Sequence, residues 1–352
     1  MKFRYIRSIH AHPITRPRSN VLTTSRANRV ATSRAYSSSS PRSPSIQDWI
    51  GALTNLPPKY DYDTLDPERL SQLRRVLPTR QSGEYLEDLR EGTEVDPASH
   101  WVLFRPKPML RDLGLDGTST EYNAPSPYTR RMWAGGSIEW SASNCPLRVG
   151  ERVTQIVNVP KVEYKKDMIF VNQQLRIYPG TVSQDCQNQG DSWSIREIRT
   201  HVFRKESPMS TTPLKPNDIG PEKALGETLS ELDNPDISFT YTPTSPLLFL
   251  YSALTHNPHK VHYDHPWTTT KEGHPRPLVH GPLTATLLIE LANLNRPSPG
   301  KKLREFRYRA TSPMVIDDPI QLVGRYTKDQ QGVDLWAVQS GKVGMKASAH
   351  YH

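Results

Sequence analysis

The stretch LVHGPLTATLLIELANL, residues 278–294, decides the fold. Leucines repeat in it at helical spacing, at Leu283, Leu287, Leu288 and Leu291. Pro282 stands in the first turn, where a proline removes no hydrogen bond that the helix would otherwise make. Because the stretch is apolar over most of its length, we predict one helix that is buried inside the protein.

Strand patterns surround this helix. ISFTYT (237–242) precedes it, and SPLLFLYSALT (245–255) suits either a helix or a buried strand. Four strand-like segments follow with short turns: KLREFRYRATSP, PIQLVGRYT, DLWAVQS and VGMKASAHY. The helices that parallel strands need between them are missing. We therefore expect a curved antiparallel sheet wrapped around the helix over residues 236–352.

Residues 46–204 carry a similar set of strand patterns. WAGGSIEW (133–140) predicts one strand, LRVGERVTQIVNVPKVEYKK (147–166) alternates like a pair of strands, and two more segments follow. Asp66 followed by Pro67 predicts the start of a helix. If this half repeats the plan of the other, the fold class is α+β, with two antiparallel sheets each wrapped around a central hydrophobic helix. Residues 205–235 are polar and proline-rich and predict a linker.

The net charge of +9 is concentrated at the N-terminus. Residues 1–47 hold nine Lys and Arg, and the first acidic residue is Asp48, so the rest of the chain is close to neutral. An Arg- and Ser-rich segment without acids is typical of an organelle transit peptide. We therefore expect residues 1–45 to be a mitochondrial transit peptide and disordered arm, and the mature protein to lie in the matrix. A basic arm that binds nucleic acid or anionic lipid is the alternative, but no second basic block with aromatics follows, so no nucleic-acid partner is expected.

The composition disfavours two further classes of protein, those held by disulfides or zinc and those that span a membrane. Cys145 and Cys186 provide neither a disulfide framework nor a zinc-site spacing. No run of about 18 apolar residues is present, so no membrane span is expected.

The stretch NPHKVHYD (257–264) concentrates polar groups directly behind an apolar segment. His256, His259 and His262 are spaced three apart, which could place them on one helix face around a metal. Pro258 argues for an irregular turn instead, and no Glu or Cys completes the set. We therefore expect no metal and no cofactor. His262 stands out because Asp264 follows it and a second polar turn, VHGP, arrives 18 residues later.

At this point a family resemblance becomes specific. YSALTHNPHKVHYD and PRPLVHGPLTATLLIELA resemble the paired signature of MaoC-like hot-dog dehydratases and (R)-specific hydratases, S-G-D-x-N-P-L-H-x-D and then P-x-x-H-G-x-x-x-A. HWVLF, LGLDG, RRMWAGGSIEW and PLRVG resemble the N-terminal repeat of fungal mitochondrial type 2 hydroxyacyl-thioester dehydratases and of bacterial mesaconyl-CoA hydratase-like proteins. The resemblance covers about residues 46–352. It implies a double hot-dog fold with one active site, in the C-terminal repeat.

The resemblance also implies a reaction. The expected activity is reversible dehydration of (R)-3-hydroxyacyl thioesters to trans-2-enoyl thioesters, on acyl carrier protein or CoA, in mitochondrial fatty acid synthesis. One alternative is a hydratase for branched dicarboxylates such as mesaconyl- or itaconyl-CoA. Another is an acyl-thioester-binding protein without catalysis. The sequence leaves a homodimer open.

Site residues follow from the same alignment. His262 falls on the family histidine, and Asn257 falls on the catalytic aspartate, so proton transfer would rest on His262 because an amide cannot accept a proton. Gly281 is expected to offer its N–H to the thioester oxygen at the helix N-terminus. The remaining candidates are expected to orient the imidazole (Asp264 and His280), to shape the acyl pocket (Trp133) or to bind a carboxylated substrate (Arg276 and the arginines of LREFRYR).

Overall fold

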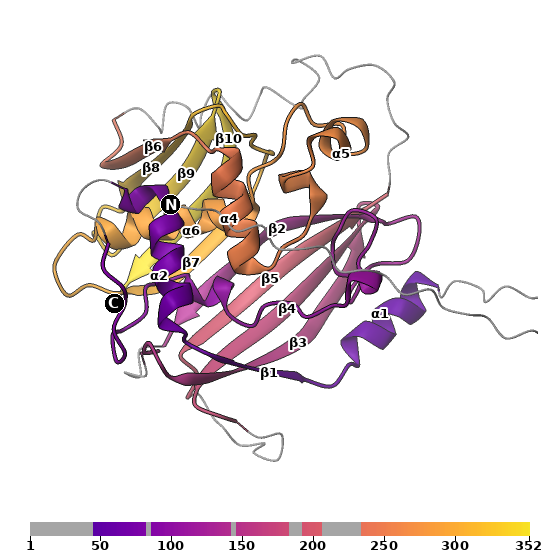
Figure 1. Cartoon of the computed structure of the whole chain (residues 1–352), viewed down its shortest axis with the longest axis horizontal. Helices are drawn as coiled ribbons and strands as arrows, with labels where there is room; N and C mark the ends of the chain where they lie inside the picture. The colour runs from indigo at the N-terminus through magenta and orange to yellow at the C-terminus, as the bar shows by residue number, and fades with distance from the viewer. Residues whose placement is uncertain (1–44, 82–85, 142–145, 183–191, 206–233) are drawn as a thin grey trace, which may run out of the picture. The chain divides into compact units, whose positions relative to one another are not determined.

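The computed structural model describes residues 45–81, 86–141, 146–182, 192–205 and 234–352. Nearly all of the expected transit peptide and of the expected linker lies outside these residues. Ser43–His352 form one compact unit (Figure 1).

The C-terminal half is the predicted sheet around a buried helix. Helix α6 (Gly281–Leu294) is buried without interruption from Leu283 to Ala292. It contacts strands of one antiparallel sheet in the order β7 (Leu303–Ala310), β10 (Lys342–Tyr351), β9 (Gly332–Gln339), β8 (Ile320–Tyr326) and β6 (Ile237–Tyr241). The ambiguous segment before the histidines is helix α4 (Ser245–Thr255), which Thr244 caps through its hydroxyl.

The N-terminal half supplies five more strands. Their order is β1 (Lys59–Thr64), β3 (Arg152–Lys165), β4 (Met168–Pro179), β5 (Ile195–Arg204) and β2 (Arg130–Trp140). The prediction of two strands over 147–166 is wrong. That segment is the single strand β3, whose pairing with β4 shifts register between Asn158 and Lys161, and a local irregularity of this kind lets one long strand bend without ending.

The two halves form one sheet, although two were expected. Strand β2 pairs with β7 from Gly135↔Arg309 to Glu139↔Glu305, which makes ten strands continuous (Figure 1). Glycines permit close approach on both sides of β2: a Cβ on Gly135 would lie 2.5 Å from the Tyr308 carbonyl oxygen of β7, and one on Gly136 would lie 2.1 Å from the Ile198 carbonyl oxygen of β5. The glycine pair of RRMWAGG is therefore explained by strand packing.

The N-terminal half lacks a counterpart of α6 among its described residues. Its helices are α1 (Ile46–Thr54), which packs on β3 and buries only Leu53, and α2 (Pro67–Val76), which packs on α4 and begins at the predicted cap Asp66. Short 3₁₀ helices complete it: η1 (Pro78–Arg80), η2 (Ser99–Val102) and η3 (Leu110–Asp112). The expectation of a central helix in each half is therefore met only by α6, and part of the N-terminal sheet faces a cavity instead.

None of the described helices is both long and apolar enough to cross a bilayer.

Candidate active site

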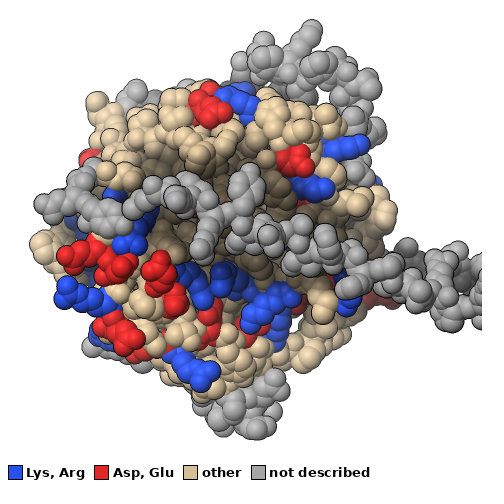
Figure 2. Space-filling view, in the orientation of Figure 1, with Lys and Arg blue, Asp and Glu red and all other residues tan. Residues whose placement is uncertain are grey.

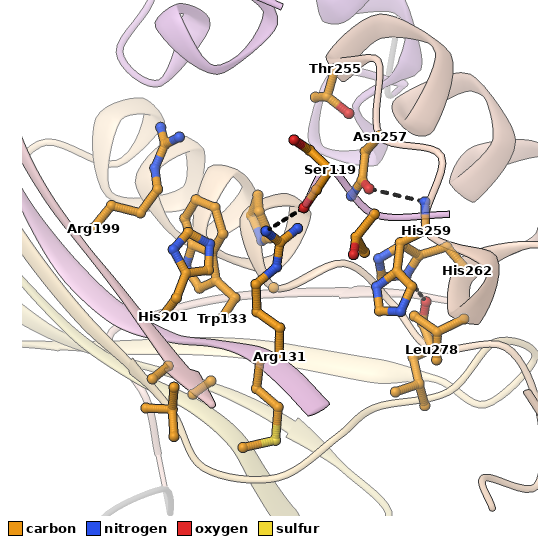
Figure 3. A pocket seen from close by; sticks show the side chains of 18 of the residues that line it. Ser119, Arg131, Trp133, Arg199, His201, Thr255, Asn257, His259, His262 and Leu278 are labelled. Carbon is orange, nitrogen blue, oxygen red and sulfur yellow. Dashed lines mark hydrogen bonds between the residues drawn. The ribbon is translucent and has the colours of Figure 1, made fainter. Parts of the chain in front are cut away.

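A cavity of about 1040 Å³ lies between the face of the N-terminal sheet and the loops of the C-terminal half. Strand β2 contributes Trp133, β5 contributes His201, and the opposite wall contains Asn257 and His262 (Figure 3). Gly281 also lines the cavity. The fold thus brings together five groups that are separated by up to about 150 residues in the sequence.

The chain reaches this cavity through the end of α4. His256 has a left-handed conformation, with φ of 55°, and the N–H of Asn257 donates to the Ser252 carbonyl at 2.9 Å. The family signature has glycine at this position, the residue that adopts such a conformation at least cost. The backbone therefore supports the ungapped alignment that places Asn257 where the signature has aspartate.

His262 ends the short 3₁₀ helix η5 (Lys260–His262), and its imidazole is oriented by the backbone. Its Nδ1 lies 2.8 Å from the Leu278 carbonyl oxygen. A carbonyl can only accept, so Nδ1 carries the proton and Nε2 keeps a free lone pair. The ring is thus set in the tautomer that a base requires.

Asp264 does not perform the orienting role that we expected. Its carboxylate accepts a hydrogen bond from the Trp267 N–H at 2.9 Å and caps helix α5 (His265–Thr270). An aspartate at this position stabilises the start of a helix, and the Leu278 carbonyl orients His262 instead.

His262 is electrically neutral at physiological pH. Burial, and then the nearby His259, lower the pKa of His262 to about 3, although its hydrogen bond to Leu278 acts in the opposite direction. The ring of His280 stacks on it, with centroids 3.6 Å apart, and burial holds the pKa of His280 well below its usual value. Two neutral rings can stack this closely, whereas two imidazolium ions would repel each other.

His280 and Gly281 form the start of α6. His280 Nε2 bonds to the Ser252 hydroxyl at 2.8 Å, which ties α6 to α4. The N–H of Gly281 belongs to the first helical turn, whose donors have no acceptor within the helix. A Cβ on Gly281 would lie 3.5 Å from the Trp133 ring. Trp133 therefore packs beside Gly281 at the start of α6.

Asn257 lies beside His262 in the same wall. Its Oδ1 accepts a hydrogen bond from the His259 N–H at 3.2 Å, which holds the amide in place (Figure 3). His259 lies 3.9 Å from carboxylate oxygens of both Asp116 and Glu272. In the described parts of the chain, no cluster of three His, Cys, Asp or Glu side chains could hold a metal ion.

Arg276 is not positioned as expected. It forms an ion pair with Asp318 and is not among the residues that line the cavity. Arg131 of β2 does line the cavity, and it donates to the Ser119 carbonyl at 3.2 Å. Its alternation with Trp133 along a strand could have indicated that both side chains share one face.

Buried ionic groups support the sheet side of the cavity. Glu197 is fully buried and accepts from Arg199 at 2.8 Å and from the Trp101 indole at 3.1 Å. The guanidinium of Arg199 lies over the Trp133 ring, and the Trp133 indole donates to the Tyr308 hydroxyl at 3.0 Å. Trp133 is therefore held in place from both sides, which sequence reasoning alone did not indicate.

Comparisons with known proteins agree with this arrangement. A family model described as hydroxyacyl-thioester dehydratase type 2 matches residues 98–316. The mesaconyl-C(4)-CoA hydratase of Chloroflexus aurantiacus is 31% identical over 249 residues, covering 68% of this chain and 78% of that protein. The mitochondrial hydroxyacyl-thioester dehydratase type 2 of Schizosaccharomyces pombe is 25% identical over 249 residues, covering 65% and 77%.

Solved structures share the fold. A MaoC-like dehydratase from Phytophthora capsici aligns with a TM-score of 0.59 at 14% identity, covering 86% of this chain and 97% of that one. HtdX of Mycobacterium tuberculosis aligns with a TM-score of 0.53 at 15% identity, covering 83% and 99%. This likeness confirms the hot-dog α+β class predicted from the sequence.

Proposed function

The chain belongs to the hydroxyacyl-thioester dehydratase type 2 family, and from that premise we propose that it interconverts (R)-3-hydroxyacyl thioesters and trans-2-enoyl thioesters at the cavity lined by His262. The observation that carries the proposal is a neutral imidazole with a free Nε2, stacked on the residue that precedes the Gly281 N–H. A base and an oxyanion donor at one site are what this elimination needs.

In this proposal His262 transfers both protons. Nε2 removes the proton from C2, and the charge that develops on the thioester oxygen is stabilised by the Gly281 N–H and the N-terminus of α6. As the C2–C3 double bond forms and the C3–O bond breaks, the imidazolium donates its proton to the departing hydroxyl, which leaves as water. Hydration is the same path in reverse. Asn257 would orient the hydroxyl or water through its side-chain amide.

The substrate and compartment belong to the proposal as well. The S. pombe relative is named mitochondrial, and residues 1–47 have the composition of a transit peptide, so we infer that the protein acts in the mitochondrial matrix. The acyl thioesters of fatty acid synthesis are one class of candidate substrates there. The C. aurantiacus relative instead acts on mesaconyl-C(4)-CoA. Arg131 is the feature of this cavity that favours a carboxylated substrate of that kind.

Hydration of enoyl thioesters tests the proposed reaction directly. Purified protein mixed with crotonyl-CoA and with longer trans-2-enoyl-CoA esters should consume the conjugated double bond and give the (R)-3-hydroxy product, detected by ultraviolet absorbance and chiral chromatography. Binding of these thioesters without any turnover would support a non-catalytic acyl-thioester-binding protein and refute the proposal.

Gly281→Ala should separate fold from chemistry. The added methyl group would meet Trp133 at an ordinary contact distance of 3.5 Å, and alanine favours the helix, so the melting temperature should stay the same or rise slightly. The methyl would nevertheless occupy the space in which the thioester oxygen meets the N–H. We expect kcat to fall roughly 10-fold or more. Unchanged kcat in a folded variant would show that the oxygen binds elsewhere.

A further inference from the structure

Arg131 is a cation inside the cavity without a paired carboxylate. Among the described residues its Nη1 donates to the Ser119 carbonyl oxygen, and no acidic side chain of these residues forms an ion pair with it. Burial lowers the pKa of Arg131, and the charge of Asp116 opposes that effect only in part. The guanidinium retains its charge at physiological pH.

The neighbouring charges are already compensated. Arg199 is paired with Glu197 at 2.8 Å, and Arg130 lies 3.8 Å from Glu272. His201 is neutral, because burial and then the charge of Arg131 hold its pKa well below the usual value. The carboxylate of Asp116 is itself bonded to the Thr118 hydroxyl and N–H. The charge of Arg131 is therefore offset only in part, by Asp116, and no described carboxylate forms an ion pair with its guanidinium.

The lining of the cavity as a whole is basic. Its Lys and Arg residues outnumber its two acidic residues, Glu121 and Glu272; these cations are Arg130, Arg131, Arg199, Arg204, Lys205 and Arg309. Basic side chains also gather near the centre of the face shown in Figure 2. Arg204, Lys205 and Arg309 are exposed, whereas Arg131 is half-buried. The three exposed cations can bind anionic groups that stay at the protein surface. Arg131 is placed to bind an anionic group that enters the cavity.

Arg131 also lies close to the proposed reacting groups. The Ser119 carbonyl that it contacts ends a loop whose Asp116 carbonyl accepts from the Lys260 N–H at 2.8 Å, within the segment that joins Asn257 to His262. Figure 3 shows the guanidinium between Trp133 and that segment. A ligand group that reaches Arg131 is thus near C2 and C3 of a bound thioester.

Binding of a neutral acyl chain next to the Arg131 guanidinium would be energetically unfavourable. Displacing water from a guanidinium without supplying an acceptor costs several kcal/mol. A carboxylate would satisfy it with two charge-assisted hydrogen bonds. The phosphate of CoA or of a carrier protein cannot do so, because the pantetheine arm holds it many bonds away from the sulfur.

We propose that Arg131 is the binding site for a carboxylate on the acyl group, so that the preferred substrates are thioesters of unsaturated or hydroxylated dicarboxylic acids. This proposal rests on the proposed function, since it places the acyl group beside His262. It assigns substrate selection to the N-terminal half and proton transfer to the C-terminal half.

A matched pair of substrates tests the site. The first substrate is the CoA monothioester of fumaric acid, which carries a carboxylate. The second is trans-4-methyl-2-pentenoyl-CoA, in which a nearly isosteric isopropyl group takes the place of that carboxylate. Arg131→Met should lower kcat/KM for the first substrate roughly 30- to 100-fold, as expected for a charge-assisted hydrogen bond, and leave the second within about threefold. Arg131→Lys should restore part of the loss. Arg152→Met, which removes an exposed arginine at the start of β3, should match the wild type.

Other outcomes would overturn the proposal. Equal losses on both CoA substrates would mean that Arg131 stabilises the reaction or the fold. The same comparison can be made with N-acetylcysteamine thioesters, which lack phosphate. If Arg131→Met lowers kcat/KM for the carboxylated CoA thioester but not for the carboxylated N-acetylcysteamine thioester, the anion that Arg131 binds belongs to CoA.

Binding measured without turnover separates failure of this proposal from failure of the proposed function. By calorimetry, succinyl-CoA should bind the wild type more tightly than butyryl-CoA, and Arg131→Met should abolish that preference. If the wild type hydrates the isopropyl substrate but shows neither the binding preference nor faster turnover of the carboxylated one, the carboxylate site is wrong and the reaction stands. If it hydrates neither substrate yet shows the binding preference, the reaction is wrong and the carboxylate site stands.

Discussion

His262→Ala is expected to lower kcat for enoyl-thioester hydration by about 100-fold or more without unfolding the protein. A positioned acid–base group usually contributes a factor of that size, and in the proposed path His262 is the only group that carries a proton. The side chain is held by one hydrogen bond to Leu278 and by stacking on His280, so its removal leaves a cavity but no buried unpaired charge. Steady-state kinetics with circular dichroism gives both readouts.

Three neighbouring variants sharpen this test. Asn257→Ala should cost less than His262→Ala, because it removes an orienting amide and not the proton acceptor. Asn257→Asp restores the carboxylate of the family signature, so activity should persist with a shifted pH profile. His259→Ala should be nearly silent. If His259→Ala is as damaging as His262→Ala, or if chelators abolish activity, the cluster binds a metal and the proton-transfer mechanism is wrong.

The free energy of unfolding should fall by several kcal/mol between pH 7 and pH 5. His262, His280 and His201 are held neutral in the folded protein, with pKa values far below the ordinary 6.5. Below pH 6.5 the unfolded chain therefore binds protons that the folded protein does not, so stability is present above that pH and is lost as the pH falls. Each such histidine contributes on the order of 2 kcal/mol between pH 6.5 and pH 5.

Urea denaturation at pH 7, 6 and 5 measures this loss. His201→Gln removes one titrating group, so its stability should fall less steeply with acid than that of the wild type, whatever its stability at pH 7. A stability that stays flat from pH 7 to pH 5 would contradict the burial of these three neutral rings.

Local patterns predicted the elements whose surroundings are simple. The stretch 278–294 predicted α6, because a segment that is apolar over most of its length favours burial, and the Asp66–Pro67 pair marked the start of α2. The family assignment made from the two signatures is likewise confirmed. In each case neighbouring residues in the chain carried enough information.

Features that depend on distant contacts were missed. The pairing of β2 with β7 brings together residues about 170 positions apart, and no residue of RRMWAGG indicates which strand will pair with it. Asp264 and Arg276 were given site roles from their closeness in sequence to His262 and Gly281. The backbone instead directs Asp264 to cap α5 and Arg276 to Asp318, whereas Arg131, far away in sequence, lines the cavity.

The pairing of β2 with β7 has a consequence for how the protein must be made. If synthesis stopped before residue 236, β2 would be left as an unpaired sheet edge, because its neighbour β7 would not yet exist. Exposed edges of this kind recruit strands from other molecules and start aggregates. Truncated products that end before residue 236 should therefore depend on chaperones to stay in solution. The two halves are not expected to fold as independent soluble domains.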